Sequence, residues 1–408
     1  MKGTQRLGGA GQVPKRGCLA RSSPPEAVFD AHAPSTSTST SSRQLMYSAC
    51  DAAAPAQPAT SSGPLAGLPV AQIASVAGLG LAALAANKLF FEQGSRAYNR
   101  VEGGTVGQEY DAWTEEGILE YYWGEHIHLG TYTDAERAGG AFKKDFKKAK
   151  YDFCDNMLAF SGAASPTAIL DVGCGFGGTS RHLGKLFPGA SVNGITLSPK
   201  QVERGTQLAK ERRLNNVKFE VMDALQMGFP DNTFDLVWAC ESGEHMPDKR
   251  KYVEEMVRVL KPGGTLVIAC WCQREETPER PLTPNDKKDL QFLYDEWAHP
   301  YFISIQEFER LMEGSGKMEA VEFERLMKGS GKMEAVVSED WTPQTIDSWR
   351  HSIWVGVVDP WPVVARPHVW YKTVREIVCL ERMHQAFATG LMEYGLMTGR
   401  KMAAPAAK

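Results

Sequence analysis

The stretch Ala168-Ile-Leu-Asp-Val-Gly-Cys-Gly-Phe-Gly-Gly178 decides the fold of this chain. Its first part, Ile169 to Val172, is a short apolar and β-prone run, which indicates a buried parallel strand. Gly173, Gly175 and Gly177 follow. Because glycine tolerates positive φ and has no Cβ, the backbone there can turn sharply and approach a ligand. The stretch therefore predicts a nucleotide-type crevice at the carboxyl end of a first strand.

Beyond the glycines the chain alternates strand and helix patterns up to about residue 275. Helices are predicted over about Thr179–Phe187 and Tyr252–Leu260, the second with Val253, Met256, Val257 and Leu260 on one face. Further strands are predicted within 191–198, 217–223, 234–240 and 265–270. Strand–helix alternation with right-handed crossovers gives a doubly wound α/β sheet.

The acids around the glycine loop distinguish between two kinds of nucleotide ligand. The glycine spacing also satisfies G-x-G-x-x-G, a dinucleotide fingerprint that expects an acid about 20 residues further on. The second strand and its end, Ser191–Ser198, contain no acid. Instead Asp171 precedes the glycines and Asp223 ends the third strand. This pattern favours S-adenosylmethionine (SAM), a small cationic nucleoside, and leaves a nicotinamide oxidoreductase as the less favoured alternative.

Five stretches carry a family resemblance over about residues 108–400. They are Leu170-Asp-Val-Gly-Cys-Gly-Phe-Gly-Gly178, Gly194-Ile-Thr-Leu-Ser-Pro199, Glu241-Ser-Gly-Glu-His-Met-Pro-Asp248, Leu260-Lys-Pro-Gly-Gly264 and Trp123-Gly-Glu-His-Ile-His128. The chain resembles class I SAM-dependent methyltransferases, and more closely the plastid γ-tocopherol methyltransferase group and its algal relatives. The resemblance implies a Rossmann-like seven-stranded sheet with N-terminal helices and an inserted helical lid. It also implies methyl transfer (EC 2.1.1).

The resemblance implies a set of cofactor contacts on the glycine loop and at the strand ends: Asp171, Gly173, Cys174, Gly175, Gly177, Thr196, Ser198, Asp223, Ala224 and Glu241. Asp171 would place the amino group of SAM, and Asp223 with Ala224 would read the adenine. A helix N-cap is the alternative role for Asp223. Most of the superfamily has an acid at the ribose, and here Thr196 or Ser198 would replace it.

The resemblance also implies methylation of a ring carbon beside a phenol, which a base that takes the phenolic proton would assist. The candidates are His126, His128, Glu241, Glu244 and His245. His245 and Glu241 are favoured because both follow a strand at its carboxyl end, and structural hydrogen bonding is the alternative role for each. If 125–128 is extended, His126 and His128 share one face. We expect no metal, since H-x-H alone lacks a third placed ligand.

Aromatic residues cluster in the segments that flank the nucleotide core: Tyr121, Tyr122, Trp123, Trp271, Trp297, Tyr301, Phe302, Trp341, Trp349 and Trp354. They are predicted to line a pocket for a prenyl tail, with ordinary core packing as the alternative. By analogy with the fold, a lid from about 275 to 330 would close over this lipophilic acceptor.

The composition of the first 87 residues predicts targeting and membrane-anchor segments rather than part of the enzyme. Residues 1–62 are basic, rich in Ser, Thr and Ala and poor in acids, which predicts a disordered chloroplast transit peptide; a disordered tail is the alternative. Residues 65–87 are nearly all apolar or small, long enough for one membrane-spanning helix. A second cleavable signal is the alternative. We therefore expect association with the plastid envelope or thylakoid membrane.

One segment is duplicated almost without change. Glu307–Val321 reads EFERLMEGSGKMEAV, and Glu322–Val336 repeats it with Lys328 in place of Glu313. Each copy predicts a helix end, a Gly-Ser-Gly turn and a short strand. A doubly wound domain has one place for such a unit, so one copy is expected to loop out or extend the lid.

Composition excludes other classes of protein. A net charge of −4 without a basic stripe argues against nucleic-acid binding. Eight scattered cysteines, none in a C-x-x-C pair, argue against a disulfide framework.

We expect one methyltransferase domain over 105–408, with the nucleotide core at 165–275 and the lid and C-terminal strands at 276–402. Rival acceptors are a sterol, a benzoquinol or an amine nitrogen, and a non-catalytic SAM-binding adaptor is a further alternative. The oligomeric state stays open.

Overall fold

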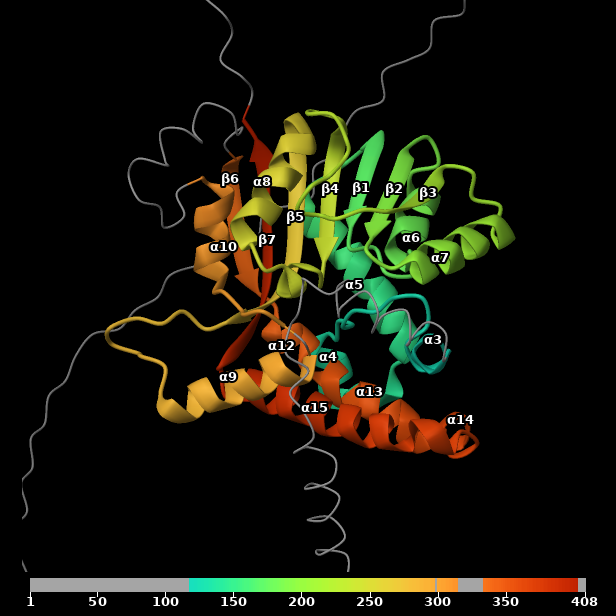
Figure 1. The fold of residues 1–408 in the computed structure, drawn as a ribbon, viewed down its shortest axis with the longest axis vertical. Helices are drawn as coiled ribbons and strands as arrows, with labels where there is room; N and C mark the ends of the chain where they lie inside the picture. Colours follow the sequence, from blue (N-terminus) through green and yellow to red (C-terminus); the bar gives the residue numbers. More distant parts are fainter. Residues whose placement is uncertain (1–116, 298, 315–332, 403–408) are drawn as a thin grey trace, which may run out of the picture. The chain divides into compact units, whose positions relative to one another are not determined.

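A seven-stranded mixed sheet lies at the centre of the computed structural model, which describes residues 117–297, 299–314 and 333–402 (Figure 1). The strand order is β3-β2-β1-β4-β5-β7-β6. The strands are β1 (Ala168–Val172), β2 (Ser191–Thr196), β3 (Val217–Val221), β4 (Phe234–Cys240), β5 (Leu260–Gln273), β6 (Met333–Asp340) and β7 (Met392–Lys401). The first five pair in parallel, while β7 runs antiparallel to both β5 and β6. The predicted Rossmann-like sheet is confirmed.

Alternate side chains of the central strands enter two separate hydrophobic cores, one on each face of the sheet. Ile169 of β1 faces the core that includes Phe153 of α5 and Leu183 of α6. Its neighbour Leu170 faces the other core, with Val253 of α8. The helices are α5 (Phe146–Ser161), α6 (Gly178–Leu186), α7 (Pro199–Glu211), α8 (Lys249–Val259) and α10 (Ile305–Met312). This period-two burial explains why the central strands read as continuous apolar runs.

Side-chain caps set where the helices begin. Ser198 accepts a hydrogen bond from the backbone of Gln201, and Pro199 occupies the first turn of α7. The helix predicted from Tyr252 begins earlier, at Lys249, because the Asp248 side chain accepts from Lys251 N. The amphipathic pattern identified its buried face and missed its cap.

A second group of helices lies across the carboxyl ends of the parallel strands (Figure 1). Its members are α3 (Ile118–Trp123), α4 (Asp134–Gly140), α9 (Pro284–Trp297), α12 (Thr342–Thr345), α13 (Asp347–Val358), α14 (Trp361–Val364) and α15 (Trp370–Ala388). Short 3₁₀ turns occupy Ala141–Lys143, Gly243–His245 and Pro367–Val369. The sequence predicted a lid at about 275–330. Four of the helices that lie across the strand ends, α12 to α15, come after that range.

The predicted leader at 1–62 and hydrophobic helix at 65–87 lie outside the described residues. Within the ranges that the structure describes, no helix is long and apolar enough to span a bilayer. The duplicated segment is described only at its ends. α10 belongs to the first copy, the second copy supplies the start of β6 at Met333, and 315–332 lie outside the described residues.

Candidate active site

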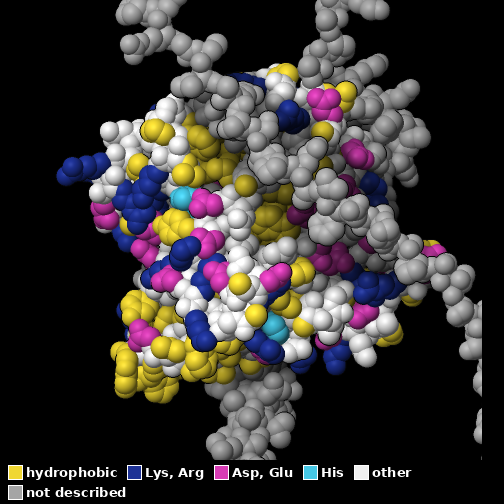
Figure 2. Space-filling model, turned by 180° about the vertical axis from the view of Figure 1, so that it is seen from behind, with side chains coloured by type: hydrophobic (Ala, Val, Ile, Leu, Met, Phe, Trp, Pro, Cys, Tyr) yellow, Lys and Arg dark blue, Asp and Glu magenta, His cyan; other side chains and the backbone are white. Residues whose placement is uncertain are grey.

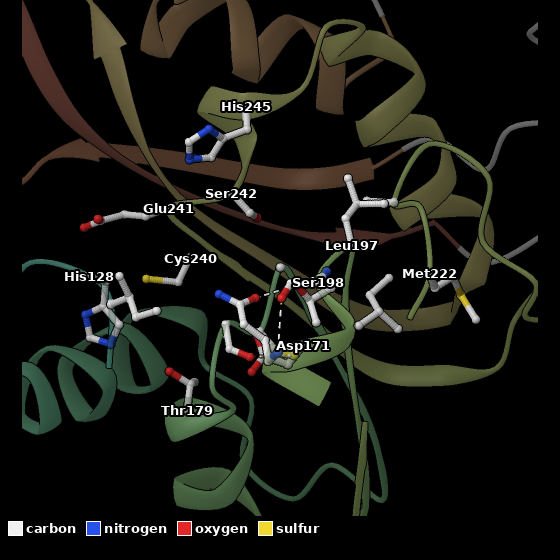
Figure 3. A pocket seen from close by; sticks show the side chains of 18 of the residues that line it. His128, Asp171, Thr179, Leu197, Ser198, Met222, Cys240, Glu241, Ser242 and His245 are labelled. Atoms are coloured by element: carbon white, nitrogen blue, oxygen red, sulfur yellow. Dashed lines mark hydrogen bonds between the residues drawn. The ribbon is translucent and has the colours of Figure 1, made fainter. Parts of the chain in front are cut away.

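Two cavities open at the carboxyl edge of the sheet. The first, here called the inner cavity, lies against the glycine loop (Figure 3). In Figure 3, Asp171 and Ser198 lie on one side of it and Glu241, Ser242 and His245 on the other. Nearly all of the predicted cofactor contacts line it: Asp171, Gly173, Cys174, Gly175, Thr196, Ser198, Asp223, Ala224 and Glu241. The structure thus brings together residues from four strand ends.

The glycine loop is shaped by positive φ and by close packing. Gly173, Gly175 and Gly177 have φ of 81°, 53° and 74°. A Cβ on Gly177 would lie 2.1 Å from the Phe219 ring, and one on Gly173 would lie 2.3 Å from Cβ of Ser242. Gly177 caps the start of α6 and is not among the residues that line the inner cavity. Its backbone sets the turn from the glycine loop into α6, and its contact with the cofactor stays a prediction.

Asp171 presents a buried carboxylate to the inner cavity. Ser180 Oγ donates to its Oδ2 at 2.6 Å, and burial raises the pKa of Asp171 to about 6. A cationic group in the cavity would favour the ionised carboxylate. The glycine loop, which side chains do not obstruct, and this carboxylate together fit the amino-acid end of SAM.

A hydrogen-bonded group around Gln201 lies at the end of β2, where the sequence has no acid. Thr196 Oγ1 donates to Oε1 of Gln201 at 2.7 Å, and Gln201 N donates to Ser198 Oγ at 3.1 Å. Gln201 itself is buried and lines the inner cavity. Gln201 is not among the site residues predicted from the sequence, so its place in the cavity wall was missed. Asp223 Oδ1 accepts from Leu225 N at 2.8 Å, which shapes its own loop while it borders the cavity.

The second cavity, here called the outer cavity, has a volume of about 600 Å³, within the usual range of small-molecule sites. Five of the predicted aromatic residues line it: Tyr122, Trp123, Trp271, Trp297 and Trp349. The others do not line it: Tyr121, Tyr301, Phe302, Trp341 and Trp354. Much of its wall comes from apolar residues of α13 to α15 that the sequence did not single out: Ile353, Val357, Val363, Val364, Val369, Trp370, Val374, Ile377 and Leu380. Among the described residues of the lid predicted at 275–330, Trp297 is the one that lines it.

The two cavities share three lining residues, Ile127, Glu241 and His245. Glu241 follows β4 with φ of 47°, a conformation uncommon for a residue with a side chain and often found at functional sites. The favoured catalytic pair therefore borders both the cofactor side and the acceptor side. This shared boundary is where a methyl group can pass between them.

Glu241 is half-buried at the end of β4, and its carboxyl group keeps its proton near neutral pH. Leu129 N and Tyr394 Oη both donate to its Oε1, at 2.8 and 2.6 Å. Burial, with the nearby Glu244 carboxylate, outweighs these bonds and raises the pKa of Glu241 to about 8. A carboxyl group with this pKa is suited to proton exchange near physiological pH. Tyr394 lies on the last strand, and no sequence pattern linked it to Glu241.

Glu244 and His245 differ from Glu241 in what they can do. Burial raises the pKa of Glu244 to about 7; Trp271 N donates to its Oε1 at 2.6 Å, while its buried Oε2 has no hydrogen-bond partner. Burial lowers the pKa of His245 to about 3, and its ring stacks on His299 with centroids 4.4 Å apart. His245 is therefore a neutral imidazole and a weak base, which places Glu241 first among the candidates.

His126 and His128 meet Cys154 of α5 in a buried cluster beside the inner cavity. Within the described ranges these three side chains form a group of metal-type donors, so the premise that H-x-H lacks a third placed ligand is wrong. Hydrogen bonds account for their contacts. His128 Nδ1 donates to the Leu129 carbonyl at 2.8 Å, which leaves its Nε2 to accept from His126 Nδ1 at 3.1 Å. We read the pair as holding 125–130 in place, since burial also lowers both pKa values.

The residues present fit a SAM-dependent transfer. When bound, SAM supplies an electrophilic methyl group on a sulfonium sulfur. Asp171 and the glycine loop would hold its amino-acid end, and Gln201 with Asp223 would border its nucleoside. Glu241 is placed to hold or accept a proton at the boundary with the outer cavity. Alignment and exclusion of water then supply much of the catalysis.

Comparison with known proteins agrees with this site. A methyltransferase domain family model matches residues 170–268. The chain is 41% identical over 303 residues to a 2-methyl-6-phytyl-1,4-hydroquinone methyltransferase from Synechocystis sp., covering 72% of this chain and 86% of that protein. It is 32% identical over 298 residues to the chloroplastic tocopherol O-methyltransferase of Arabidopsis thaliana, covering 70% and 79%.

Solved structures show the same fold. The geranyl diphosphate C-methyltransferase of Streptomyces coelicolor A3(2) aligns with a TM-score of 0.55 at 18% identity, covering 75% of this chain and all of that one. At this identity the likeness concerns the fold alone. Together, the strand order, the glycine-loop site and the curated relatives show that the chain belongs to the class I SAM-dependent methyltransferases, in the family that includes the phytyl-hydroquinone and tocopherol methyltransferases.

Proposed function

We propose that the chain transfers the methyl group of SAM to a ring carbon of a prenylated phenol of the tocopherol type in a plastid membrane. The observation that carries the proposal is the boundary that the two cavities share at Glu241 and His245. An apolar cavity beyond that boundary suits a long hydrocarbon tail, with the phenol ring at the polar end. Phytyl-hydroquinone and tocopherol are named in the relatives.

Glu241 is the residue that we assign to proton transfer. Its ionised carboxylate takes the phenolic proton, which raises electron density at the adjacent ring carbons. That carbon forms a bond to the methyl group as the carbon–sulfur bond breaks and its electron pair stays on sulfur. The ring carbon would then lose its own proton to water while Glu241 returns the phenolic proton to the oxygen, and the ring becomes aromatic again. The His245 imidazole, neutral at physiological pH, accepts a hydrogen bond from the phenolic substrate and orients the substrate.

A plastid location is proposed on two grounds. The relatives from rice and Arabidopsis thaliana are named as chloroplastic. Residues 1–62 have the composition of a transit peptide. Fusion of 1–62 to a fluorescent protein tests the address: fluorescence in plastids supports it, and fluorescence in the cytosol contradicts it.

A panel of acceptors with isotope-labelled SAM tests the function. The panel contains a phytyl-hydroquinone, a tocopherol lacking one ring methyl, a sterol and a secondary amine. We expect label on a ring carbon of one of the prenylated phenols, located by NMR of the product. Transfer only to the sterol or the amine would contradict a prenylated phenol as the acceptor. SAM binding without transfer to any acceptor would support a non-catalytic adaptor.

A further inference from the structure

Nine large hydrophobic side chains are exposed on the helices α13, α14 and α15. We call this surface the apolar patch: Trp354, Val357, Val358, Trp361, Val364, Trp370, Val374, Ile377 and Val378. Seventeen large hydrophobic side chains are exposed in the described part of the chain, and these nine all fall between 354 and 378. Figure 2 shows hydrophobic side chains gathered at the lower left, over this end of the molecule. Single exposed apolar residues are ordinary, whereas a contiguous patch marks an interaction surface.

The exposure follows the period of a helix. Trp370, Val374, Ile377 and Val378 stand at i, i+4, i+7 and i+8 on α15, so they form one outward face. The most exposed members lie on α13 and α14, where Val358 is 66% and Trp361 72% exposed. A helix that only covers a core would turn polar residues outward here. The patch therefore requires an apolar partner.

The patch is also the rim of the outer cavity. Val357, Val364, Trp370, Val374 and Ile377 are both exposed at the surface and part of the cavity lining. A ligand that leaves the cavity between these side chains emerges onto the patch. A folded partner seated on this rim, whether a second copy or the apolar segment 65–87, would close the route that an acceptor must use. A fluid apolar phase would leave it open.

We propose that the apolar patch rests on a lipid bilayer surface and that the outer cavity opens into the bilayer, so that the acceptor's tail enters without crossing water. Trp354 and Trp361 in the patch suit the boundary between headgroups and acyl chains, where tryptophan rings bury and their N–H groups stay hydrated. Trp370 Nε1 instead donates to the Val363 carbonyl at 2.9 Å, so this side chain adds apolar surface to the patch. The inference rests on the proposed function: the bilayer is where a prenylated acceptor dissolves and from which it would enter the outer cavity.

The test compares two matched variants of the full chain. Val358→Ser with Val378→Ser removes patch side chains that do not line the cavity. Leu186→Ser with Val337→Ser removes exposed aliphatic side chains elsewhere, 46% and 50% exposed. The readout is cosedimentation with phosphatidylcholine vesicles. We expect the patch variant to lose about tenfold in partition and the control variant to bind like the wild type, with SAM affinity unchanged in both. Equal binding by all three, without quenching of Trp361 in the second measurement below, would overturn the proposal.

A second measurement stays decisive if residues 65–87 hold every variant on the vesicles. The fluorescence of Trp361 is isolated as the difference between the wild type and Trp361→Phe, in vesicles that carry brominated acyl chains. Quenching of that difference places Trp361 in the bilayer, and its absence overturns the docking. Sedimentation velocity adds a third outcome: if the patch variant turns a dimer into a monomer, the patch is an interface between copies. If Trp361 is quenched but the acceptor panel shows no methyl transfer to a prenylated phenol, the docking stands and the proposed acceptor is wrong.

Discussion

The replacement of Glu241 by Gln separates a proton-transfer role from a structural one. Gln keeps the size of the side chain, and its amide oxygen can still accept from Leu129 N and Tyr394 Oη. It cannot take a proton from a phenol. We expect turnover to fall by about 10²–10⁴-fold, the usual effect of a lost general base, with SAM affinity reduced far less.

The pKa of Glu241 sets how steeply the rate should depend on pH. Burial and Glu244 raise the pKa of Glu241 to about 8, so about one-tenth of the free enzyme carries the ionised form at pH 7. The wild-type kcat/KM should rise about tenfold per pH unit below 8 and level off above it, since only the ionised form accepts the proton. The Gln variant should show no rise with this midpoint.

Tyr394→Phe tests the same carboxyl group from the other side. The tyrosine hydroxyl donates to Glu241 Oε1 and favours the ionised form. A hydrogen bond to a charged group contributes about 1.5–3 kcal/mol, so its loss should move the midpoint up by about one to two pH units. Glu254→Gln, a partly buried glutamate on α8 that lines neither cavity, is the control. Unchanged turnover and pH profile in Glu241→Gln would refute the reasoning.

Three further variants test the cofactor side and the buried carboxyls. Asp171→Asn should weaken SAM binding about 10–100-fold by calorimetry while leaving the melting temperature near that of the wild type; equal affinity would remove Asp171 from the cofactor site. Gly177→Ala places a Cβ 2.1 Å from Phe219 at φ of 74° and should cost roughly 3 kcal/mol of unfolding free energy; an unchanged denaturation midpoint would contradict the packing. Burial raises the pKa of Glu244 from 4.5 to about 7, so the folded state binds the proton more tightly and wild-type stability should fall between pH 4.5 and 7 by about 3 kcal/mol relative to Glu244→Gln. Parallel stability curves for the two proteins would show that Glu244 does not titrate in this range.

The sheet and the cofactor loop were predictable from local sequence. Ile169 to Val172 with its following glycines, and the alternation of strands and helices after it, depend on short-range patterns of burial and φ. The same patterns identified Asp171, Asp223 and Glu241, because acids at strand ends are visible in sequence. The close approach of Gly177 to Phe219 was not visible in the sequence, since it is a contact between distant elements.

The acceptor side was less predictable because distant segments build it. Tyr394 reaches Glu241 from 153 positions along the chain. The α13–α15 wall consists of ordinary helical apolar residues, which local patterns cannot separate from core. Trp341 shows the converse: it was expected at a pocket and instead packs in the main core. Cys154 joined His126 and His128 only through folding of α5 beside the segment that carries them.

A structure of the enzyme with S-adenosylhomocysteine and a prenylated phenol tests the central claim most directly. The account predicts the phenol ring at the boundary formed by Ile127, Glu241 and His245, with its hydroxyl in hydrogen-bonding reach of Glu241. The cofactor's sulfur would face the ring from the inner cavity, and the tail would run between α13 and α15. A sulfur atom pointing away from that boundary, or a ring bound outside the outer cavity, would contradict it.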